Sequence, residues 1–190
     1  MAINIKRVIS LYIIELLILI VLSIIGFYVG PLFISQTAIN ELRSELMGTV
    51  NLGPNFIFLH NLVIDTLMAI PIIGPPIFVL ALVMTGFILG VYVAFTINSP
   101  IALIFALVVT MFFPHGIIEL MAYAFSTTGS LFLTGRVIRS VRGTGSVTRN
   151  DFIVLLIYYA ISVLLLYVAA NVEYLEIVKL SGAIRGLIQR

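Results

Sequence analysis

A histidine and a glutamate stand four residues apart, directly after a proline, in the segment PHGIIE at residues 114–119. Proline suits the first turn of a helix and frees a carbonyl one turn earlier, while residues at this spacing share one helix face. Pro114 and Gly116 therefore predict a helix break, with His115 and Glu119 beside it. The pair could handle ions or protons or form a polar hinge. The structural alternative is that the two side chains bond each other and the freed carbonyls.

Other polar side chains interrupt long apolar stretches of the chain. His60, Asn61 and Asp65 fall in one such stretch, and Glu15 falls in another. An ionisable group at the centre of a membrane helix costs about 2.5–3.5 kcal/mol, so we expect none of them to face lipid. Glu15 lies about two turns from Lys6 and Arg7, and we expect it to extend toward the membrane surface. The predicted buried polar cluster consists of His115, Glu119, Asp65, His60 and Asn61.

The sequence offers little for catalysis or metal binding. Cysteine is absent, which excludes disulfides and thiolate ligands, and neither GxSxG nor HExxH occurs. A metal ion would need His60 or Asp65 as a further ligand beside His115 and Glu119. We therefore expect no enzyme, no metal site and no cofactor.

The composition indicates which solvent surrounds these residues. Hydrophobic residues make up 62% of the 190 residues and charged residues 9%, whereas soluble domains have about 45–50% and about 25%. The mean hydropathy is +1.24. The sequence therefore predicts an all-α, polytopic transmembrane bundle whose partner is the lipid bilayer. The net charge of +2 is carried by clumped residues, so we expect no nucleic-acid partner.

A helix needs about 20 apolar residues to cross a hydrocarbon core of about 30 Å. On this criterion we predict a single membrane domain with about five spans, at residues 8–34, 56–73, 77–97, 101–134 and 152–170. The stretch 56–73 is short, and it either crosses or re-enters. The stretch 101–134 is divided at Pro114, as one kinked helix that ends near Ala124 or as a half-helix followed by a span.

The segments between the spans are more polar. Residues 35–55 predict an amphipathic surface helix or loop, residues 136–151 a basic loop, and residues 171–190 a tail along the membrane surface. No lysine or arginine occurs between Arg43 and Arg136. The positive-inside rule therefore places the N-terminus and the 136–151 loop in the cytoplasm, which requires an even number of crossings between them.

Glycine and arginine patterns suggest contact surfaces. Gly26 with Gly30, and Gly86 with Gly90, have GxxxG spacing, which marks helix contacts within one chain or between copies. The basic loop contributes a second set, which we expect to orient the chain and attract anionic headgroups or to dock an acidic partner. This set is Arg136, Arg139, Arg142 and Arg149.

Three segments together resemble one known family. They are FLHN at residues 58–61, TGFILG at residues 85–90 and PHGIIEL at residues 114–120. From about residue 5 to residue 175 the chain looks like the stage II sporulation protein M family of integral membrane proteins, which is also widespread in archaea. Thr85 stands where the family pattern has asparagine. The resemblance implies a membrane scaffold like the one that gathers peptidoglycan-degrading proteins in spore formers, and the cysteine-free, Ile/Val-rich helices suit an archaeal member.

We therefore expect a non-enzymatic scaffold or anchoring subunit of an envelope-associated assembly in the cell membrane. Its partners would be other membrane or envelope proteins and further copies of itself, with a dimer favoured through the glycine faces. The alternative is a transporter or permease-like subunit with a buried polar site at His115, Glu119 and Asp65.

Overall fold

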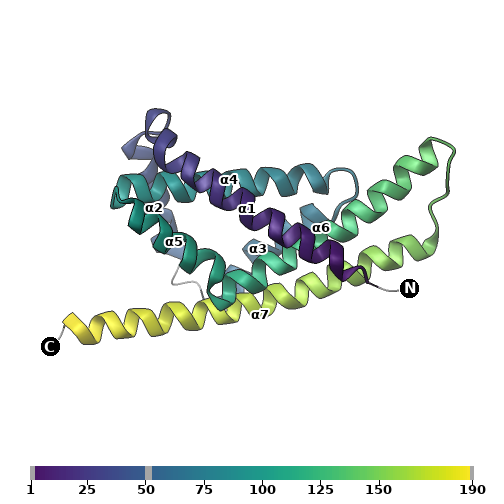
Figure 1. The fold of residues 1–190 in the computed structure, drawn as a ribbon. Helices are drawn as coiled ribbons and strands as arrows, with labels where there is room; N and C mark the ends of the chain where they lie inside the picture. Colours follow the sequence, from purple (N-terminus) through teal and green to yellow (C-terminus); the bar gives the residue numbers. More distant parts are fainter. Residues whose placement is uncertain (1–2, 50–52, 189–190) are drawn as a thin grey trace.

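The computed structural model describes the backbone of residues 3–49 and 53–188 and the side chains of residues 3–44 and 53–179. Every regular element in these ranges is helical, which confirms the predicted all-α bundle (Figure 1). The elements are α1 (Ile5–Val29), the 3₁₀ helix η1 (Gly30–Leu32), α2 (Gln36–Thr49), α3 (Pro54–Ala69), α4 (Gly74–Thr96), α5 (Pro100–Phe112), α6 (Pro114–Val141) and α7 (Arg149–Ile188).

Four helical segments in the described part of the chain are long and apolar enough to cross a membrane. They are Ile5–Leu32, Gly74–Thr96, Pro114–Val141 and Arg149–Lys179. The prediction of about five spans counted one more, the stretch 56–73. This stretch corresponds to α3, which has 16 residues and is about 24 Å long, less than a hydrocarbon core of about 30 Å.

The two GxxxG pairs face each other, because α1 packs along α4 through its glycines. A Cβ atom at Gly26 would lie 2.1 Å from the carbonyl oxygen of Phe87, and one at Gly90 would lie 2.0 Å from that of Ser23. Only glycine permits this approach of two backbones. The predicted helix contact is therefore confirmed within one chain, and the glycine faces are already occupied there.

The helix is interrupted at Pro114, which separates the half-helix α5 from the longer helix α6. Phe113 between them is extended, with φ −68° and ψ 154°, as expected for a residue that precedes proline. This confirms the second interpretation of residues 101–134. The alternative of one kinked helix ending near Ala124 is wrong.

The short helix α3 ends against α6 and is held there by hydroxyl groups. Ser126 donates to the carbonyl of Asp65 at 3.1 Å, and Ser130 donates to the carbonyl of Ile70 at 2.9 Å. The carbonyl of Ile70 also accepts from the N–H of Gly74 at 2.7 Å, so the serine hydroxyls add contacts between α3 and α6 at the C-terminal end of α3.

Residues 136–151 do not form the predicted loop. Helix α6 continues to Val141 and α7 starts at Arg149, so the connection covers only residues 142–148. Arg136 lies 5.5 Å above the ring of Phe132 and 3.2 Å from a carboxylate oxygen of Asp151 on α7. The two helices extend toward this connection because the long arginine side chain can pack and pair at a helix end.

Residues 171–188 also differ from the prediction, since they continue α7 and do not form a separate surface tail. The stretch 35–55 is confirmed as helical, in α2, whose described side chains are mostly exposed apart from Ile39. Residues 1–2, 50–52 and 189–190, which those predictions also covered, lie outside the described ranges.

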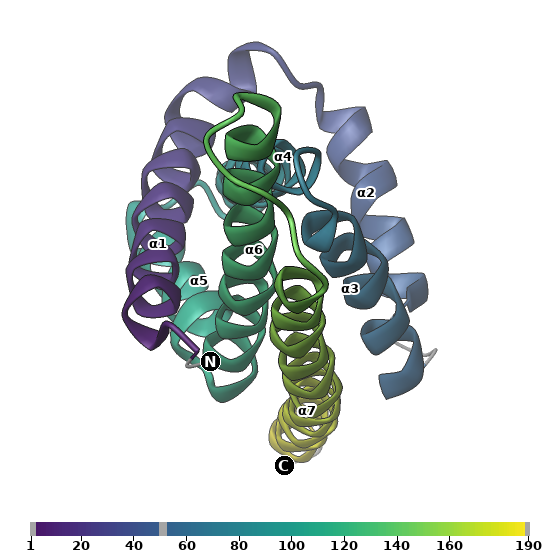
Figure 2. The same ribbon diagram turned by 90° about the vertical axis from the view of Figure 1, so that its right-hand side faces the viewer.

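Helix α6 is the central helix of the bundle. Viewed from the end with the N-terminus, α6 lies at the centre, with α1 and α5 on one side, α2 and α3 on the other, and α7 along the lower edge (Figure 2). The N-terminus and the 142–148 connection lie at the same end of the molecule, and α7 ends at the opposite one (Figure 1). The half-helices α3 and α5 therefore meet the long helices near the middle of the bundle.

Candidate functional site

The helix break at Pro114 brings α5 and α6 into close backbone contact. A Cβ atom at Gly116 would lie 2.0 Å from the carbonyl oxygen of Thr110, so glycine is needed here. Pro114 occupies the start of α6, where its missing N–H costs nothing. Both predicted break residues therefore have a structural reason, and the break directs the first turn of α6 toward α7.

His115 hydrogen-bonds through Nδ1 to a carboxylate oxygen of Glu176 on α7. The side chains are 15% and 24% exposed. The structural alternative from the sequence, in which His115 bonds Glu119, is wrong because α7 supplies a nearer acceptor from 61 residues away. His115 thus links the break to the far end of α7.

Glu119 lies one turn further along α6. Tyr123 donates its hydroxyl to Glu119 at 3.0 Å, and the side chain of Asn61 on α3 also hydrogen-bonds to Glu119. Asn61 is buried, as predicted. Neutral donors thus hold this carboxyl group.

Asp65 on α3 is fully buried, as predicted. Its Oδ2 accepts a hydrogen bond from Ser162 of α7 at 2.8 Å, while its Oδ1 has no hydrogen-bond partner in the described part of the chain. A buried carboxylate that is only half satisfied is costly in an apolar interior.

Glu15 corrects the sequence analysis, which expected it to extend toward the membrane surface. It is fully buried, and neither of its carboxylate oxygens has a hydrogen-bond partner among the side chains and backbone that the structure describes. Glu15 belongs to the buried stripe of α1, which turns inward with the helix face that carries the glycines. That stripe consists of Val8, Glu15, Leu19, Ser23, Gly26 and Phe27.

Three carboxyl groups from three helices thus converge in the bundle. Glu15 interacts electrostatically with both Glu119 and Asp65. The hydrogen-bond partners of this acidic cluster, defined as Glu15, Asp65 and Glu119, are all neutral side chains. Like charges this close repel strongly in an apolar interior, so protons or a cation must neutralise part of the cluster.

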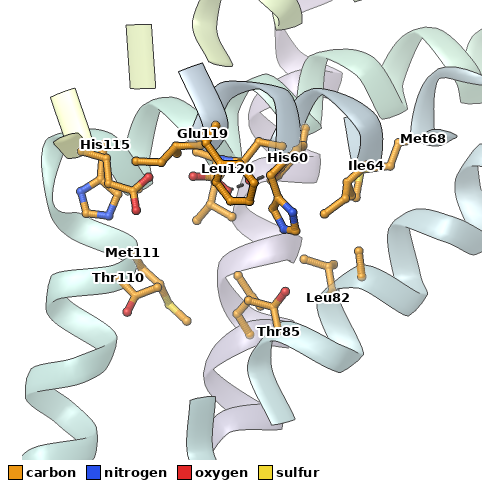
Figure 3. A pocket seen from close by; sticks show the side chains of 18 of the residues that line it. His60, Ile64, Met68, Leu82, Thr85, Thr110, Met111, His115, Glu119 and Leu120 are labelled. Atoms are coloured by element: carbon orange, nitrogen blue, oxygen red, sulfur yellow. Dashed lines mark hydrogen bonds between the residues drawn. The ribbon is translucent and has the colours of Figure 1, made fainter. Parts of the chain in front are cut away.

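A cleft of about 720 Å³ leads to this cluster. In Figure 3, His60, Glu119 and Leu120 line one side of it, with Thr85 and Leu82 on the opposite side. Its lining consists of Leu19, Leu42, Phe56, Ile57, His60, Asn61, Ile64, Met68, Ala81, Leu82, Thr85, Thr110, Met111, His115, Gly116, Glu119, Leu120, Tyr123, Glu173 and Ile177.

The predicted cluster is therefore only partly assembled. Asn61, Asp65 and Glu119 come together, while His115 lines the cleft with its bond to Glu176. His60 is exposed and stacks on Phe56 with ring centroids 6.4 Å apart, so its predicted burial is wrong. An exposed histidine at a cleft wall can meet a ligand without entering the buried network.

The residues that the sequence analysis missed come mostly from α7. Ser162 bonds Asp65, Glu173 lines the cleft, and Glu176 bonds His115. Residues 162, 166, 169, 173 and 176 follow helical spacing, and three of the five are polar. This face could have been found by extending the helix past residue 170.

The arginines of the basic segment lie at the helix ends beside the connection. Arg136 and Arg139 belong to the last turns of α6, Arg142 caps it, and Arg149 begins α7. Arg136 is already paired with Asp151, whereas Arg139 is exposed. The contact with headgroups or an acidic partner stays a prediction for this set.

Among the described side chains, those of residues 3–44 and 53–179, no group of three or more histidine, aspartate or glutamate side chains is arranged to hold a metal ion. Comparison with family models, curated proteins and solved structures found no match to this chain. The resemblance to the stage II sporulation protein M family therefore stays a prediction.

Proposed function

We propose that this chain is a transporter or permease-like membrane subunit in which the acidic cluster carries a proton or cation reached through the cleft. The observation that carries the proposal is the position of Glu119. It lines the cleft and also interacts electrostatically with the fully buried Glu15. A carboxyl group that lines an open cavity and also interacts electrostatically with a buried carboxyl group can exchange its proton or counter-ion with the cavity.

The local architecture supports this role. Short helices whose ends meet near the middle of a membrane bundle are a common way to build transport sites. Both α3 and α5 are short, and the break between α5 and α6 borders the cleft at Gly116. Ionisable groups at membrane depth usually mark ion pathways, because their desolvation cost otherwise has no return in stability.

Proton flux into liposomes tests the proposal. The purified chain is reconstituted with a pH-sensitive dye inside, and a potassium diffusion potential drives protons inward. We expect flux above that of empty liposomes, and Glu119→Gln should abolish most of it because the amide cannot carry a proton. Glu41→Gln changes an exposed carboxylate on α2 outside the cleft and is the matched control. Flux that is equal in all three proteins would remove the transport proposal.

A non-enzymatic scaffold or anchoring subunit of an envelope-associated assembly is the second candidate. Its support is α7, which runs for 40 residues and extends past the other helices at its C-terminal end (Figure 1). The resemblance to the sporulation family supports the same role. Self-association would need a face other than the glycine faces, which α1 and α4 already fill. Native mass analysis after gentle detergent extraction should then reveal an oligomer or a bound partner, and a strict monomer without a partner would contradict it.

We propose further that the chain lies in the cell membrane with its N-terminus and the 142–148 connection in the cytoplasm. The positive-inside rule supports this orientation, since arginines flank the connection. The two segments also lie at the same end of the molecule (Figure 1). Protease access to either segment from the outside of intact cells would contradict this placement.

A further inference from the structure

The cleft has two chemically distinct parts. Its walls are mainly apolar and include Leu19, Leu82 and Met111, which come from three different helices. Its polar groups include the carboxyl groups of Glu119 on α6 and Glu173 on α7. A ligand that fills this space must therefore present an apolar body together with a group that suits carboxylates.

The charge of the lining favours a cation. None of the described residues that line the cleft is lysine or arginine. His115 bonds Glu176 and also interacts electrostatically with Glu173, which leaves Glu119 without a basic partner among the residues of the lining. Glu15, which interacts electrostatically with Glu119, adds further negative potential when charged. An anion would meet uncompensated carboxylates, while a cation would gain charge-assisted contacts.

The size of the cleft favours an organic molecule. Its volume of about 720 Å³ lies within the range of about 300–1,000 Å³ that holds drug-sized ligands. An inorganic ion would leave most of the apolar wall without contacts. A neutral acyl chain would fill the wall but leave the carboxyl groups without a partner.

We propose that the cleft binds a lipophilic organic cation, a molecule with one positively charged ammonium or phosphonium centre on an apolar body. This inference rests on the proposed transport function, since it names the class of solute that the same cleft would carry. Glu119 and Glu173 contact the charged centre, and the apolar wall contacts the body. Tyr123, whose hydroxyl bonds Glu119, also lines the cleft and adds an aromatic ring close to the charged centre.

Two ions of nearly the same size and shape but opposite charge test this inference. The chain is placed in phosphatidylcholine nanodiscs, and binding of radiolabelled tetraphenylphosphonium and tetraphenylborate is measured against empty nanodiscs. We expect saturable binding of the phosphonium cation and no saturable binding of the borate anion. Equal binding of the two ions, as an apolar groove filled by any hydrophobic molecule would give, or binding of neither would overturn the proposal.

Three variants locate the binding. Glu119→Gln and Glu173→Gln should each weaken cation binding about tenfold or more, because each removes a charged partner. Glu41→Gln should leave it unchanged. Glu173 lies on a different helix from Glu119, so a folding defect in one variant leaves the other informative, and size-exclusion profiles identify such a defect. If Glu119→Gln and Glu173→Gln both fold and both bind the cation with unchanged affinity, these residues do not form the cation site.

The transport proposal and the proposal of an organic cation as ligand can be tested separately on one preparation. Proton flux that depends on Glu119 without phosphonium binding would remove the ligand class and keep the transport proposal. Saturable phosphonium binding without proton flux or cation uptake would keep the binding site and remove transport.

Discussion

The two halves of the bundle pack their helices in opposite ways, one in close backbone contact and the other around an open cleft. Helices α1 and α4 touch backbone to backbone, since Gly26 and Gly90 each leave no room for a methyl group. Helices α3, α5, α6 and the end of α7 instead enclose the cleft of about 720 Å³ against the faces of α1 and α4 that carry Leu19 and Leu82. Close contact leaves no space for water or ligand, whereas short helices and a proline break leave both space and polar groups.

This difference indicates that the α1–α4 contact should determine stability and that the half with the cleft should bind ligands and protons. The α1–α4 contact is continuous and apolar, so we expect it to form the rigid frame of the molecule. The acidic cluster lies where that frame meets the open half, with Glu15 from α1 and the other two carboxyl groups from α3 and α6. Substitutions should therefore affect folding most in the closed half and ligand or proton handling most in the open half.

The largest effect on stability should come from Gly90→Leu, which breaks the closed half. Its side chain would collide with the backbone of Ser23 and Phe27 on α1. Overpacking of this kind costs about 1–3 kcal/mol or more, so thermal stability in detergent should fall sharply. Gly135→Leu is the matched control, because nothing lies within 4 Å of a Cβ atom there. Equal melting temperatures of the two variants would show that the α1–α4 contact is not the rigid frame.

A smaller loss should follow Ser162→Ala in the open half. It removes the hydrogen bond that Oδ2 of Asp65 accepts and leaves a buried carboxyl group less satisfied. Such losses in membrane bundles amount to about 1–2 kcal/mol. Ser140→Ala, near the end of α6, should change the melting temperature little. If both serine variants melt alike, the bond to Asp65 does not hold α3 against α7.

A still more local effect should follow Glu176→Ala. The variant loses the bond to His115 that fastens the end of α7 to the start of α6. We expect about fivefold faster hydrogen exchange around residues 173–179, which corresponds to about 1 kcal/mol of lost local stability. Residues 152–165 of α7 serve as the internal reference and should exchange as before. Uniformly faster hydrogen exchange along the whole of α7 would mean that the bond between Glu176 and His115 does not stabilise the end of the helix locally.

The smallest effect should come from Ile72→Gly, in the turn that joins α3 to α4. Ile72 has a φ of +72°, a conformation that β-branched residues rarely adopt. Glycine should relieve this strain and raise stability by up to about 1 kcal/mol. Ile73→Gly is the neighbouring control, since Ile73 has a φ of −82° and gains nothing from glycine. Chemical or thermal unfolding should therefore show a higher free energy of unfolding for Ile72→Gly than for the unmodified chain, and a lower one for Ile73→Gly.

Local signals in the sequence predicted much of the fold. Proline at position 114 predicted the break, and the glycine pairs predicted helix contacts, because both effects depend on a few neighbouring residues. Glu15 was misplaced because only its distance from Lys6 and Arg7 was considered. Its spacing of four, eight and eleven residues from Leu19, Ser23 and Gly26 puts it on the glycine face, which the sequence also contained.

The rest depended on contacts between distant parts of the chain. The charged residues of 171–190, which include Glu173 and Glu176, led to the prediction of a tail along the membrane surface. The structure places Glu173 and Glu176 beside His115 and the cleft, across a separation of about 60 residues, 61 for the bonded pair. Which of several buried polar residues meet is set by how the helices pack, and spacing along one helix cannot determine it.

The central claim is that an open cleft lined by carboxyl groups reaches Glu119, and labelling of an introduced thiol tests it most directly. The chain has no cysteine, so Thr85→Cys places a unique thiol in the cleft, and Thr37→Cys places one on the exposed face of α2 outside it. After correction for reactivity toward a free thiol, a cationic methanethiosulfonate should modify the Thr85→Cys variant about tenfold faster than an anionic one. Adding Glu119→Gln should reduce that ratio, whereas it should leave the ratio for the Thr37→Cys variant unchanged. A cleft thiol that does not react, or that reacts equally with both reagents, would contradict the account.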